Sequence, residues 1–599
     1  MNQHNFQINL RGIIDLLSNH LYSTPHTFLR ELLQNGVDAI AARSRLPGKF
    51  SPAIGIELIE GKTAPTLVFE DNGIGLTEEE IHRFIATIGE SSKRLARGEE
   101  AGDFIGQFGI GLLSCFVVAD EITMITRSAR VSGAPGYEWR GRSDGTYSVR
   151  EAQSEFEPGT RVFIRAREDA RSLFEHDVLF ERVRHYGGLL PVPIHAVRGE
   201  TRRRLNEESA PWRAGYPSRR AEDEAMLEFG RQAFETRFLD WIPLKSKAGG
   251  VDGVAFVLPY AASLAAKQKH RVYLKNMLLT ESADNLLPEW AFFVRCVVNA
   301  TNLRPTASRE SFYEDKALSQ TQTELGECLR NYLMELKQHD REQLERLIAV
   351  HHRSFKSLAV EDDEFFRIIA DLLPFETSHG TMALGEIRRN ERVLRYARSV
   401  DQFRQISSVA AAQGYCVVNG GYAWDTELLE RVPEVFGETE VEQVDASELV
   451  QSFEDLDSEE HEQAFALLRE ADAALRPYQC RAEIKKFLPE DLPALYSLSA
   501  EGQFRRSVEL TKEVSSELWS GLMDSLAGNA GSGLSELTFN YRNPLVQRLA
   551  KLQEPRRLRL AAGVLYVQSL LMGHHPLKGR ELELLNKGLI ELLELGLES

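Results

Sequence analysis

A glycine-rich turn that follows directly on a predicted strand most constrains the fold of this chain. Thr66–Glu70 (TLVFE) is rich in β-branched and aromatic residues, which predicts a strand, and Glu70–Thr77 (EDNGIGLT) runs on from it. Gly73 and Gly75 allow the backbone to turn tightly and to approach a ligand. Asp71 can accept a hydrogen bond from an exocyclic amine such as that of adenine, or it can simply form an Asp-Asn-Gly turn. The segment alone leaves both interpretations open.

A helical segment before this strand carries a second polar pattern. Phe28–Ala42 reads FLRELLQNGVDAIAA, and Glu31 and Asn35 are four residues apart, so they share one face of a helix. Asp38, seven residues after Glu31, lies on the same face. The carboxylate can act as a general base, and the amide oxygen can be a ligand for Mg²⁺. The alternative is an ordinary solvated helix face.

Two further segments follow. Gly106–Gly111 (GQFGIG) runs into the apolar stretch Leu112–Ala119, so it can offer backbone N–H groups and a positive helix end to phosphates. It is neither a Walker P-loop nor a glycine-rich loop with Rossmann spacing. Thr160–Ala166 (TRVFIRA) predicts a strand, and its opening hydroxyl, from Thr160, can support Asp71 or a bridging water. Each segment alone is weak evidence for a nucleotide site, since loops and turns of this kind are common.

The four segments in this order resemble the Bergerat-type ATP-binding fold shared by gyrase, the ninety-kilodalton heat-shock chaperones, histidine kinases and MutL proteins. Among these families, the sequence most resembles the ninety-kilodalton heat-shock family. Leu16–Ile40 (LLSNHLYSTPHTFLRELLQNGVDAI) resembles its opening signature, and Ile105–Asp120 (IGQFGIGLLSCFVVAD) resembles its lid hinge. Arg271–Glu310 resembles its middle domain, and Asn543–Leu597 resembles its C-terminal helices more weakly. The resemblance implies an ATP-dependent chaperone of the bacterial type.

The resemblance also implies residue roles. Glu31 is the general base for the attacking water, with Arg30 beside it, and Asn35 is the ligand of Mg²⁺. Arg309, in SRE, is the middle-domain arginine that meets the γ-phosphate, although a surface ion pair is the simpler interpretation. Asp71 binds the adenine amine. Thr160 assists Asp71, Asp38 and Gly75 line the base pocket, and Gly106, Gln107, Gly109 and Gly111 lie near the phosphates.

Some positions depart from the family pattern. Phe84 and Leu112 replace an Asn and a Phe expected around the pocket, Glu90 replaces a Lys near the lid, and Tyr313 stands where a glutamine is usual. These changes bear on nucleotide affinity and lid closure. The chain ends LELGLES and lacks the acidic tail and the long charged linker of eukaryotic members, so partners that dock on that tail are not expected.

Composition supports a globular protein that does not wrap nucleic acid. The 599 residues carry 71 basic and 89 acidic side chains, a net charge of −18, whereas a phosphate backbone attracts a basic face. Five scattered cysteines without metal spacing indicate buried thiols in a reducing compartment. Neither a signal peptide nor an apolar run of membrane-spanning length is present, so we expect a cytoplasmic protein that binds no membrane.

We expect an α+β multidomain fold with three parts: a Bergerat-type ATP-binding α/β sandwich over 1–215, a middle α/β domain over 216–475, and a mainly helical dimerisation domain over 476–599. Thr24 and Pro25 predict a helix N-terminus. Arg198–Met226 reads as an exposed connection, and a helix is expected to begin near Pro288. Glu434–Glu462 has twelve acidic residues and no Lys or Arg, which favours a solvated surface over a dedicated partner site.

The predicted function is that of an ATPase chaperone. ATP binding and hydrolysis would drive clamp closure of a homodimer, formed through Pro544–Leu597, that acts on client proteins. The alternative is a holdase or scaffold that binds ATP but scarcely hydrolyses it. A DNA-directed relative is disfavoured by the net charge and the middle-domain match. A histidine kinase is disfavoured because no phospho-acceptor helix pair precedes the nucleotide domain.

Overall fold

A computed structural model describes most of the chain. It covers residues 25–61, 64–85, 111–153, 156–207, 209–262, 269–282, 285–306, 311–437, 439–498, 506–507, 510 and 535–597. The chain divides into two compact units, Met1–Leu333 and Met334–Ser599. The expected α+β class is confirmed. The expected division into three domains at 215 and 475 stays a prediction.

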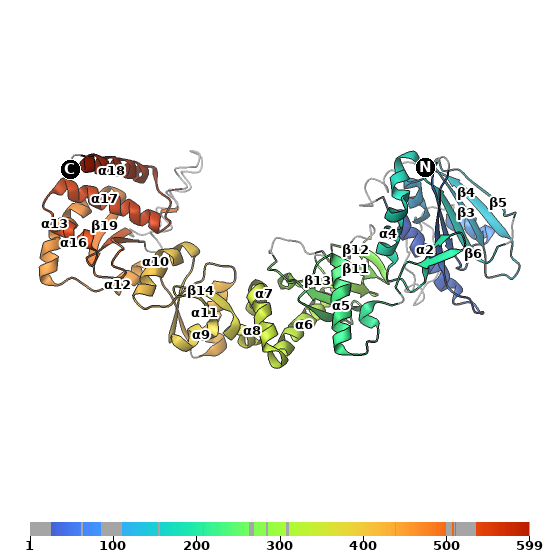
Figure 1. Ribbon diagram of the computed structural model, residues 1–599, viewed down its shortest axis with the longest axis horizontal. Coiled ribbons are helices and arrows are strands. Elements are labelled where there is room, and N and C mark those ends of the chain that lie inside the picture. The colour runs from blue at the N-terminus through green and yellow to red at the C-terminus, as the bar shows by residue number, and fades with distance from the viewer. Residues whose placement is uncertain are drawn as a thin grey trace, which may run out of the picture. The chain divides into compact units, whose positions relative to one another are not determined.

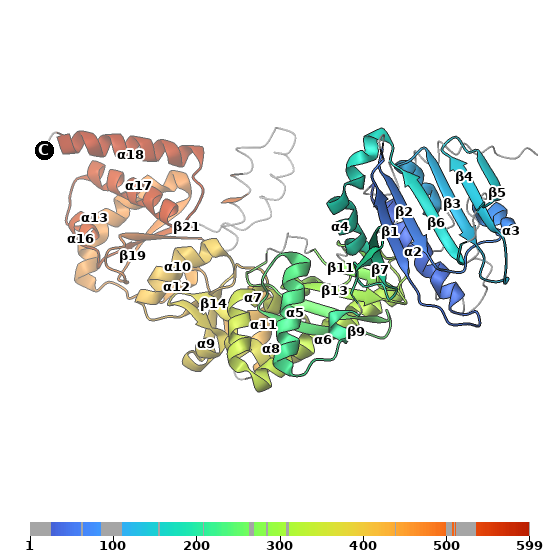
Figure 2. The same ribbon diagram turned by 45° about the vertical axis from the view of Figure 1, so that its right-hand side comes forward.

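The first unit is built on a mixed sheet whose eight described strands follow the order β5-β4-β3-β6-β2-β1-β7-β8. Figure 2 shows the strands from β1 to β5 side by side. All neighbours pair antiparallel except β1 and β7, which are parallel. The bounds are β1 Ile54–Ile59, β2 Thr66–Asp71, β3 Glu121–Arg127, β4 Gly136–Arg142, β5 Tyr147–Glu151, β6 Gly159–Arg165, β7 Ile194–Arg198 and β8 Thr201–Arg204. The strands predicted over Thr66–Glu70 and Thr160–Ala166 are therefore confirmed as β2 and β6.

Helix α2 (Thr27–Arg43) packs against this sheet. Its apolar side chains recur at helical spacing and are fully or almost fully buried, notably Phe28, Leu29, Leu32 and Leu33. A methyl group at Gly36 would lie 3.0 Å from the Phe69 ring of β2, so glycine lets the helix approach the sheet closely. The N-cap is His26, which makes no side-chain capping bond, and Thr27 opens the helix, so the predicted start at Thr24 and Pro25 is two residues too early.

The same unit contains further helices and helical turns. They are α3 (Glu78–Glu80), the π-helical turn η2 (Ile81–Ile85), the 3₁₀ turns η5 (Gly111–Val117), η6 (Glu168–Phe174) and η7 (Pro211–Arg213), α4 (His176–Gly187) and α5 (Arg219–Phe234). A second sheet has the described order β12-β11-β13-β10-β9. Its strands are β9 (Asp240–Ser246), β10 (Val251–Val257), β11 (Arg271–Leu274), β12 (Met277–Thr280) and β13 (Val294–Ala300).

One expectation for this unit is corrected. The helix expected near Pro288 is only a 3₁₀ turn, η8 (Glu289–Ala291), because Trp290 and Ala291 are buried and the valine-rich β13 follows almost at once. The connection Arg198–Met226 is mostly exposed, as expected, and it is also anchored. Trp212 Nε1 donates to Asp252 Oδ2 at 2.8 Å, and Arg213 Nη2 donates to Asp252 Oδ1 at 2.6 Å, which ties η7 to β10.

The second unit contains another mixed sheet, with the described order β15-β14-β17-β16-β18. Its strands are β14 (Pro374–Thr377), β15 (Gly380–Ala383), β16 (Val393–Ala397), β17 (Val417–Asn419) and β18 (Glu440–Gln443). The helices of this region are α6 (Lys316–His339), which begins in the first unit, α7 (Arg341–Glu361), α8 (Asp363–Ile369), α9 (Leu384–Asn390), α10 (Val400–Ala412), α11 (Asp425–Phe436) and α12 (Ala446–Gln451), with the 3₁₀ turn η9 (Ala370–Leu372) after α8.

The end of the chain combines helices with a small sheet of described order β19-β21-β20. Its elements are α13 (Ser458–Leu475), the 3₁₀ turn η10 (Arg476–Tyr478), β19 (Cys480–Lys485), β20 (Ala494–Ser497), β21 (Ser535–Asn540), α16 (Pro544–Ala550), α17 (Pro555–Met572) and α18 (Gly579–Leu597). Figures 1 and 2 show α18 lying along α17. Pro555 is the first residue of α17 and separates this helix from α16.

The five cysteines are free thiols. Four of them, Cys115, Cys296, Cys416 and Cys480, are buried, and Cys328 is partly buried. This confirms the interpretation of scattered apolar thiols. Burial raises the pKa of the Cys115 thiol, so the thiol stays protonated near neutral pH.

Candidate functional site

Helix α2 supplies the polar side chains that the sequence selected. Glu31 and Asp38 are buried at 4% and 2% exposure, whereas Asn35 is exposed. The Arg30 Nε atom lies 3.8 Å from Glu31 Oε1, and this ion pair is itself buried. Burial of charge is costly unless it is paired, so a buried carboxylate with an arginine beside it is held in place by more than packing.

Asp71 lies at the end of β2. Its Oδ1 atom accepts a hydrogen bond from the Gly73 backbone N–H at 2.9 Å, the one hydrogen bond to this carboxylate among the described residues. Burial raises the pKa of Asp71, the Gly73 hydrogen bond opposes the shift, and the charge of Glu70 adds to it, so the pKa is about 7. Burial destabilises the ionised form of this carboxylate, and a ligand that donates a hydrogen bond to it would stabilise that form.

The turn after Asp71 requires glycine. Gly75 has a φ of +63°, and a methyl group there would lie 1.9 Å from the Arg127 carbonyl oxygen. At Gly73 the same group would lie 2.6 Å from Asp71 Oδ1 and 2.5 Å from the Cβ of Ala39 on α2. The turn is also pinned, because the Ile74 N–H donates to the Ala39 carbonyl at 3.0 Å. The backbone therefore runs close to α2 beside the Asp71 carboxylate.

Two threonine hydroxyls lie next to this turn. Thr160 pairs with Asp71 in the β2–β6 register, and its Oγ1 is 3.1 Å from Thr126 Oγ1. Thr126, on β3, also accepts the Leu76 N–H at 3.0 Å and lies 3.2 Å from the Gly159 carbonyl oxygen. Sequence reasoning missed Thr126, because only the pairing of β3 with β6 brings this ordinary strand residue to the glycine turn.

The other predicted positions are placed only in part. Gly106, Gln107, Gly109, Glu90 and Arg309 lie outside the described residues. Gly111 opens η5, which packs against α2. Phe84 belongs to η2, and Leu112 is partly buried against the core of the unit. Tyr313 is 50% exposed, with the Arg304 guanidinium 5.7 Å from its ring centroid.

The arrangement suits an adenine nucleotide. Asp71 offers a buried acceptor for an exocyclic amine, Gly73 and Gly75 let the backbone pass where a side chain would clash with Ala39 or Arg127, and the threonine pair can orient a water. The exposed amide of Asn35 and the buried carboxylate of Glu31 lie one helical turn apart on α2. An amide oxygen of this kind is a suitable ligand for Mg²⁺.

Known proteins share this architecture. Residues 22–152 match the family model described as histidine kinase-, DNA gyrase B- and HSP90-like ATPase. The first part of the chain is therefore an ATPase-type domain of this class. Residues 259–389 match the model of the Hsp90 protein family. Over these two regions the chain is similar to the Hsp90 family, and it is also similar to bacterial chaperones of the HtpG type.

Three relatives illustrate the likeness. Chaperone protein HtpG of Oleidesulfovibrio alaskensis is 30% identical over 378 residues, which cover 59% of this chain and 58% of the relative. HtpG of Rhodospirillum rubrum is 31% identical over 52% of this chain and 53% of its own length. HtpG of Nitrosomonas eutropha is 27% identical, covering 63% and 64%. The matched part thus spans less than two thirds of the length of these relatives.

Membrane crossing has no support in the helices. Among those that the structure describes, none combines the length and the apolar character that a span requires.

Proposed function

We propose that the chain is an ATP-dependent molecular chaperone that binds and hydrolyses ATP in the first unit. The observation that carries the proposal is the Asp71 carboxylate, buried with a pKa of about 7 beside a glycine turn, within the region that matches the ATPase family. In this proposal Asp71 accepts the adenine amine, and the Thr126–Thr160 hydroxyl pair supports it. Asp38 and Gly75 line the base pocket. The relatives are named as chaperones, which supports the same conclusion.

The chemistry is assigned to α2. Glu31 takes a proton from the attacking water as the bond between the γ-phosphorus and the bridging oxygen breaks, and Arg30 holds the Glu31 carboxylate in position. Asn35 holds Mg²⁺, which neutralises charge on phosphate oxygens when bound. Gly106, Gln107, Gly109 and Gly111 lie near the phosphates, and Arg309 meets the γ-phosphate.

ATP turnover by variants tests these roles. Glu31→Ala is expected to lower turnover by roughly 10²–10⁴-fold with ATP binding retained, because only proton transfer is removed. Arg309→Ala is expected to lower it by up to about 10³-fold. Glu200→Ala and Arg198→Ala, at the exposed β7–β8 turn, serve as matched controls and should leave turnover unchanged. Equal turnover in Glu31→Ala and wild type would exclude the assigned mechanism.

A holdase or scaffold is the second candidate. The departures at Phe84, Glu90, Leu112 and Tyr313 favour it, since they fall around the pocket, the lid and the loop that would carry Arg309. Tight ATP binding with turnover equal to a buffer control would support this candidate and exclude the first.

We also propose a homodimer that acts on client proteins, held together by the C-terminal helices. In support, α18 exposes a row of apolar side chains, and α17 exposes two near its end. They are Leu582, Leu589, Ile590, Leu592, Leu593, Leu597, Leu571 and Met572. A second copy would cover this surface.

The mass in solution tests the dimer. Leu593→Asp, at a side chain 67% exposed, should convert a dimer into a monomer in sedimentation equilibrium at micromolar concentration. Val131→Asp, at an exposed turn of the first unit, is the control and should remain dimeric. A wild-type protein of monomer mass would rule out the proposal.

A further inference from the structure

A hollow of about 530 Å³ lies on the N-terminal half of α13, in the second unit. Its lining residues come from the helix and the loop before it: Leu456, Asp457, Ser458, His461, Glu462 and Phe465. The last four follow the spacing i, i+3, i+4 and i+7, so they share one face of α13. Phe465 is 62% exposed, which leaves a large apolar ring in contact with water beside the hollow.

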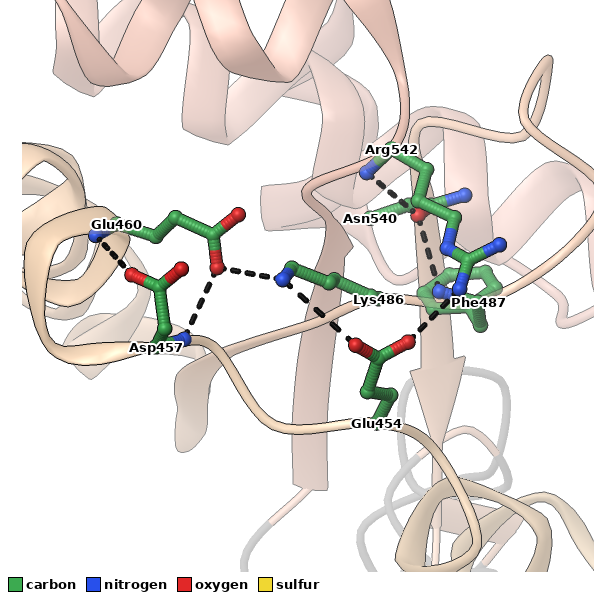
Figure 3. A network of polar contacts seen from close by, with 7 residues as sticks. All are labelled: Glu454, Asp457, Glu460, Lys486, Phe487, Asn540 and Arg542. Atoms are coloured by element: carbon green, nitrogen blue, oxygen red, sulfur yellow. Dashed lines mark hydrogen bonds and ion pairs between the residues drawn. The ribbon is translucent and has the colours of Figure 1, made fainter.

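The rim of the hollow is held rigidly by a network of ion pairs (Figure 3). Lys486 Nζ lies 2.6 Å from Glu460 Oε2 and 3.7 Å from Glu454 Oε1. Arg542 Nη2 donates to Glu454 Oε2 at 2.8 Å. Asp457 and Glu460 form a reciprocal capping box at the start of α13, with both bonds 2.9 Å long. The loop and the first helical turn are therefore preorganised, which lowers the entropy that binding would cost.

The same network decides the charge of the hollow. The nearby cations are already paired: Lys486 with Glu460, and Arg542 with Glu454. Lys485 pairs with Asp455 at 2.5 Å. By contrast, Glu462 makes no ion pair within the described part of the chain. The six lining residues include two carboxylates, Asp457 and Glu462, and neither Lys nor Arg. The hollow thus carries negative charge beside an exposed aromatic ring.

We propose that this hollow binds an extended segment of another protein in which an arginine lies beside an apolar side chain. A guanidinium can stack on the face of Phe465 while it approaches the Glu462 carboxylate three residues earlier, and the adjacent apolar side chain can cover Leu456. Charge complementarity selects this occupant, because an acidic segment would be repelled. The lining residues belong to the second unit and the nucleotide residues to the first, and the proposal does not depend on ATP hydrolysis.

Fluorescence anisotropy of labelled peptides on the full-length protein tests the proposal. The probe is the peptide GSLRFRSG, and the matched peptides are GSLEFESG, without cations, and GSSRSRSG, without apolar side chains. Only the first is expected to bind saturably, and more weakly as salt is raised. Phe465→Ser should weaken this binding by at least about tenfold, because it removes the aromatic contact. Glu462→Gln should weaken it by about threefold.

Matched controls separate the hollow from general stickiness. Val131→Ser removes an exposed apolar side chain elsewhere, and Glu434→Gln removes an exposed carboxylate from α11, so both should bind the probe like wild type. Both hollow variants change exposed side chains and should keep the thermal unfolding midpoint of wild type. Equal binding of the acidic peptide, or unchanged binding by Phe465→Ser, would overturn the proposal. A fall in oligomer mass with Phe465→Ser would overturn it in favour of a second copy as the occupant.

Discussion

Two buried carboxylates, one in each unit, differ in how many hydrogen bonds their surroundings donate to them. Asp71 is 6% exposed and receives one hydrogen bond from the described residues, from the Gly73 N–H. Glu581, in the first turn of α18, is 1% exposed and is held by Arg506 through two hydrogen bonds of 2.8 and 2.7 Å. Tyr566 Oη and the Lys578 N–H each donate to it at 2.8 Å.

The pKa values follow this difference. Burial raises the pKa of Asp71 to about 7, and the single hydrogen bond does not offset it. Burial also acts to raise the pKa of Glu581, but the hydrogen bonds and charge of Arg506 outweigh it and bring the pKa below its ordinary value. A carboxylate whose role is structural is thus fully satisfied inside the chain. Asp71 keeps capacity to accept a donor, as a ligand-binding group must.

Breaking the C-terminal pair should have the largest effect. Arg506→Met leaves Glu581 buried without its cation, which is expected to lower the free energy of unfolding of this region by up to about 5 kcal/mol. Hydrogen exchange of peptides from α17 and α18 measures the loss locally. The double variant Arg506→Met with Glu581→Leu should recover most of it, because no charge is then left buried.

A surface pair gives the reference for this experiment. Arg220 Nε lies 2.9 Å from Glu224 Oε1 on α5, and both side chains are largely exposed. Arg220→Ala should therefore change stability by less than about 0.5 kcal/mol. A loss in Arg506→Met as small as this would show that the buried pair is not a structural anchor.

The pH dependence should run in opposite directions at the two carboxylates. The pKa of Asp71 is raised in the folded protein, so its contribution to stability is complete below about pH 4 and is lost as pH rises toward 7, by on the order of 4 kcal/mol. The pKa of Glu581 is lowered, so its contribution is present above about pH 4.5 and is lost as pH falls below that value. Hydrogen exchange of peptides from β2 and from α18 separates the two trends.

Asp71→Asn is the matched variant for this measurement. The amide oxygen can still accept the Gly73 N–H, but it does not titrate, so the fall in stability of β2 between pH 4 and pH 7 should disappear. The variant should also lose ATP binding, because an amide cannot supply the same charged acceptor. A stability curve of Asp71→Asn that parallels wild type would show that Asp71 is not the group responsible.

The sequence predicts these elements best where the pattern is local and long. The apolar spacing over Gly579–Leu597 matches α18 in full, and the β-branched runs match β2 and β6. It fails where a distant contact decides the structure. Trp290 is buried next to β13, which limits the expected helix to a short turn, and Trp212 is fixed by Asp252, forty residues later.

The site divides along the same line. Glu31, Asn35 and Asp71 can be selected from short motifs, because spacing on one helix or at one strand end is visible in the sequence. The raised pKa of Asp71 could not be predicted, since it depends on burial by α2 and the neighbouring strands. Thr126 carries no motif, and the pairing of β3 with β6 alone brings it to Thr160.

The smallest expected effect is at Thr126, which tests whether the hydroxyl network beside Asp71 only stabilises the fold or also positions the turn for a ligand. Its hydroxyl accepts the Leu76 N–H at 3.0 Å and lies within hydrogen-bond distance of the Gly159 carbonyl and of Thr160 Oγ1, in a fully buried position. Thr126→Val keeps the shape but leaves Leu76 without its acceptor, so the local free energy of unfolding should fall by about 1–2 kcal/mol, measured by exchange of β3 peptides. Thr126→Ser keeps the hydroxyl and should restore the Leu76 contact. If Thr126→Val lowers ATP affinity more than Thr126→Ser at matched stability, the hydroxyl network positions the Asp71 turn for its ligand. Equal affinities in the two variants would limit Thr126 to a structural role.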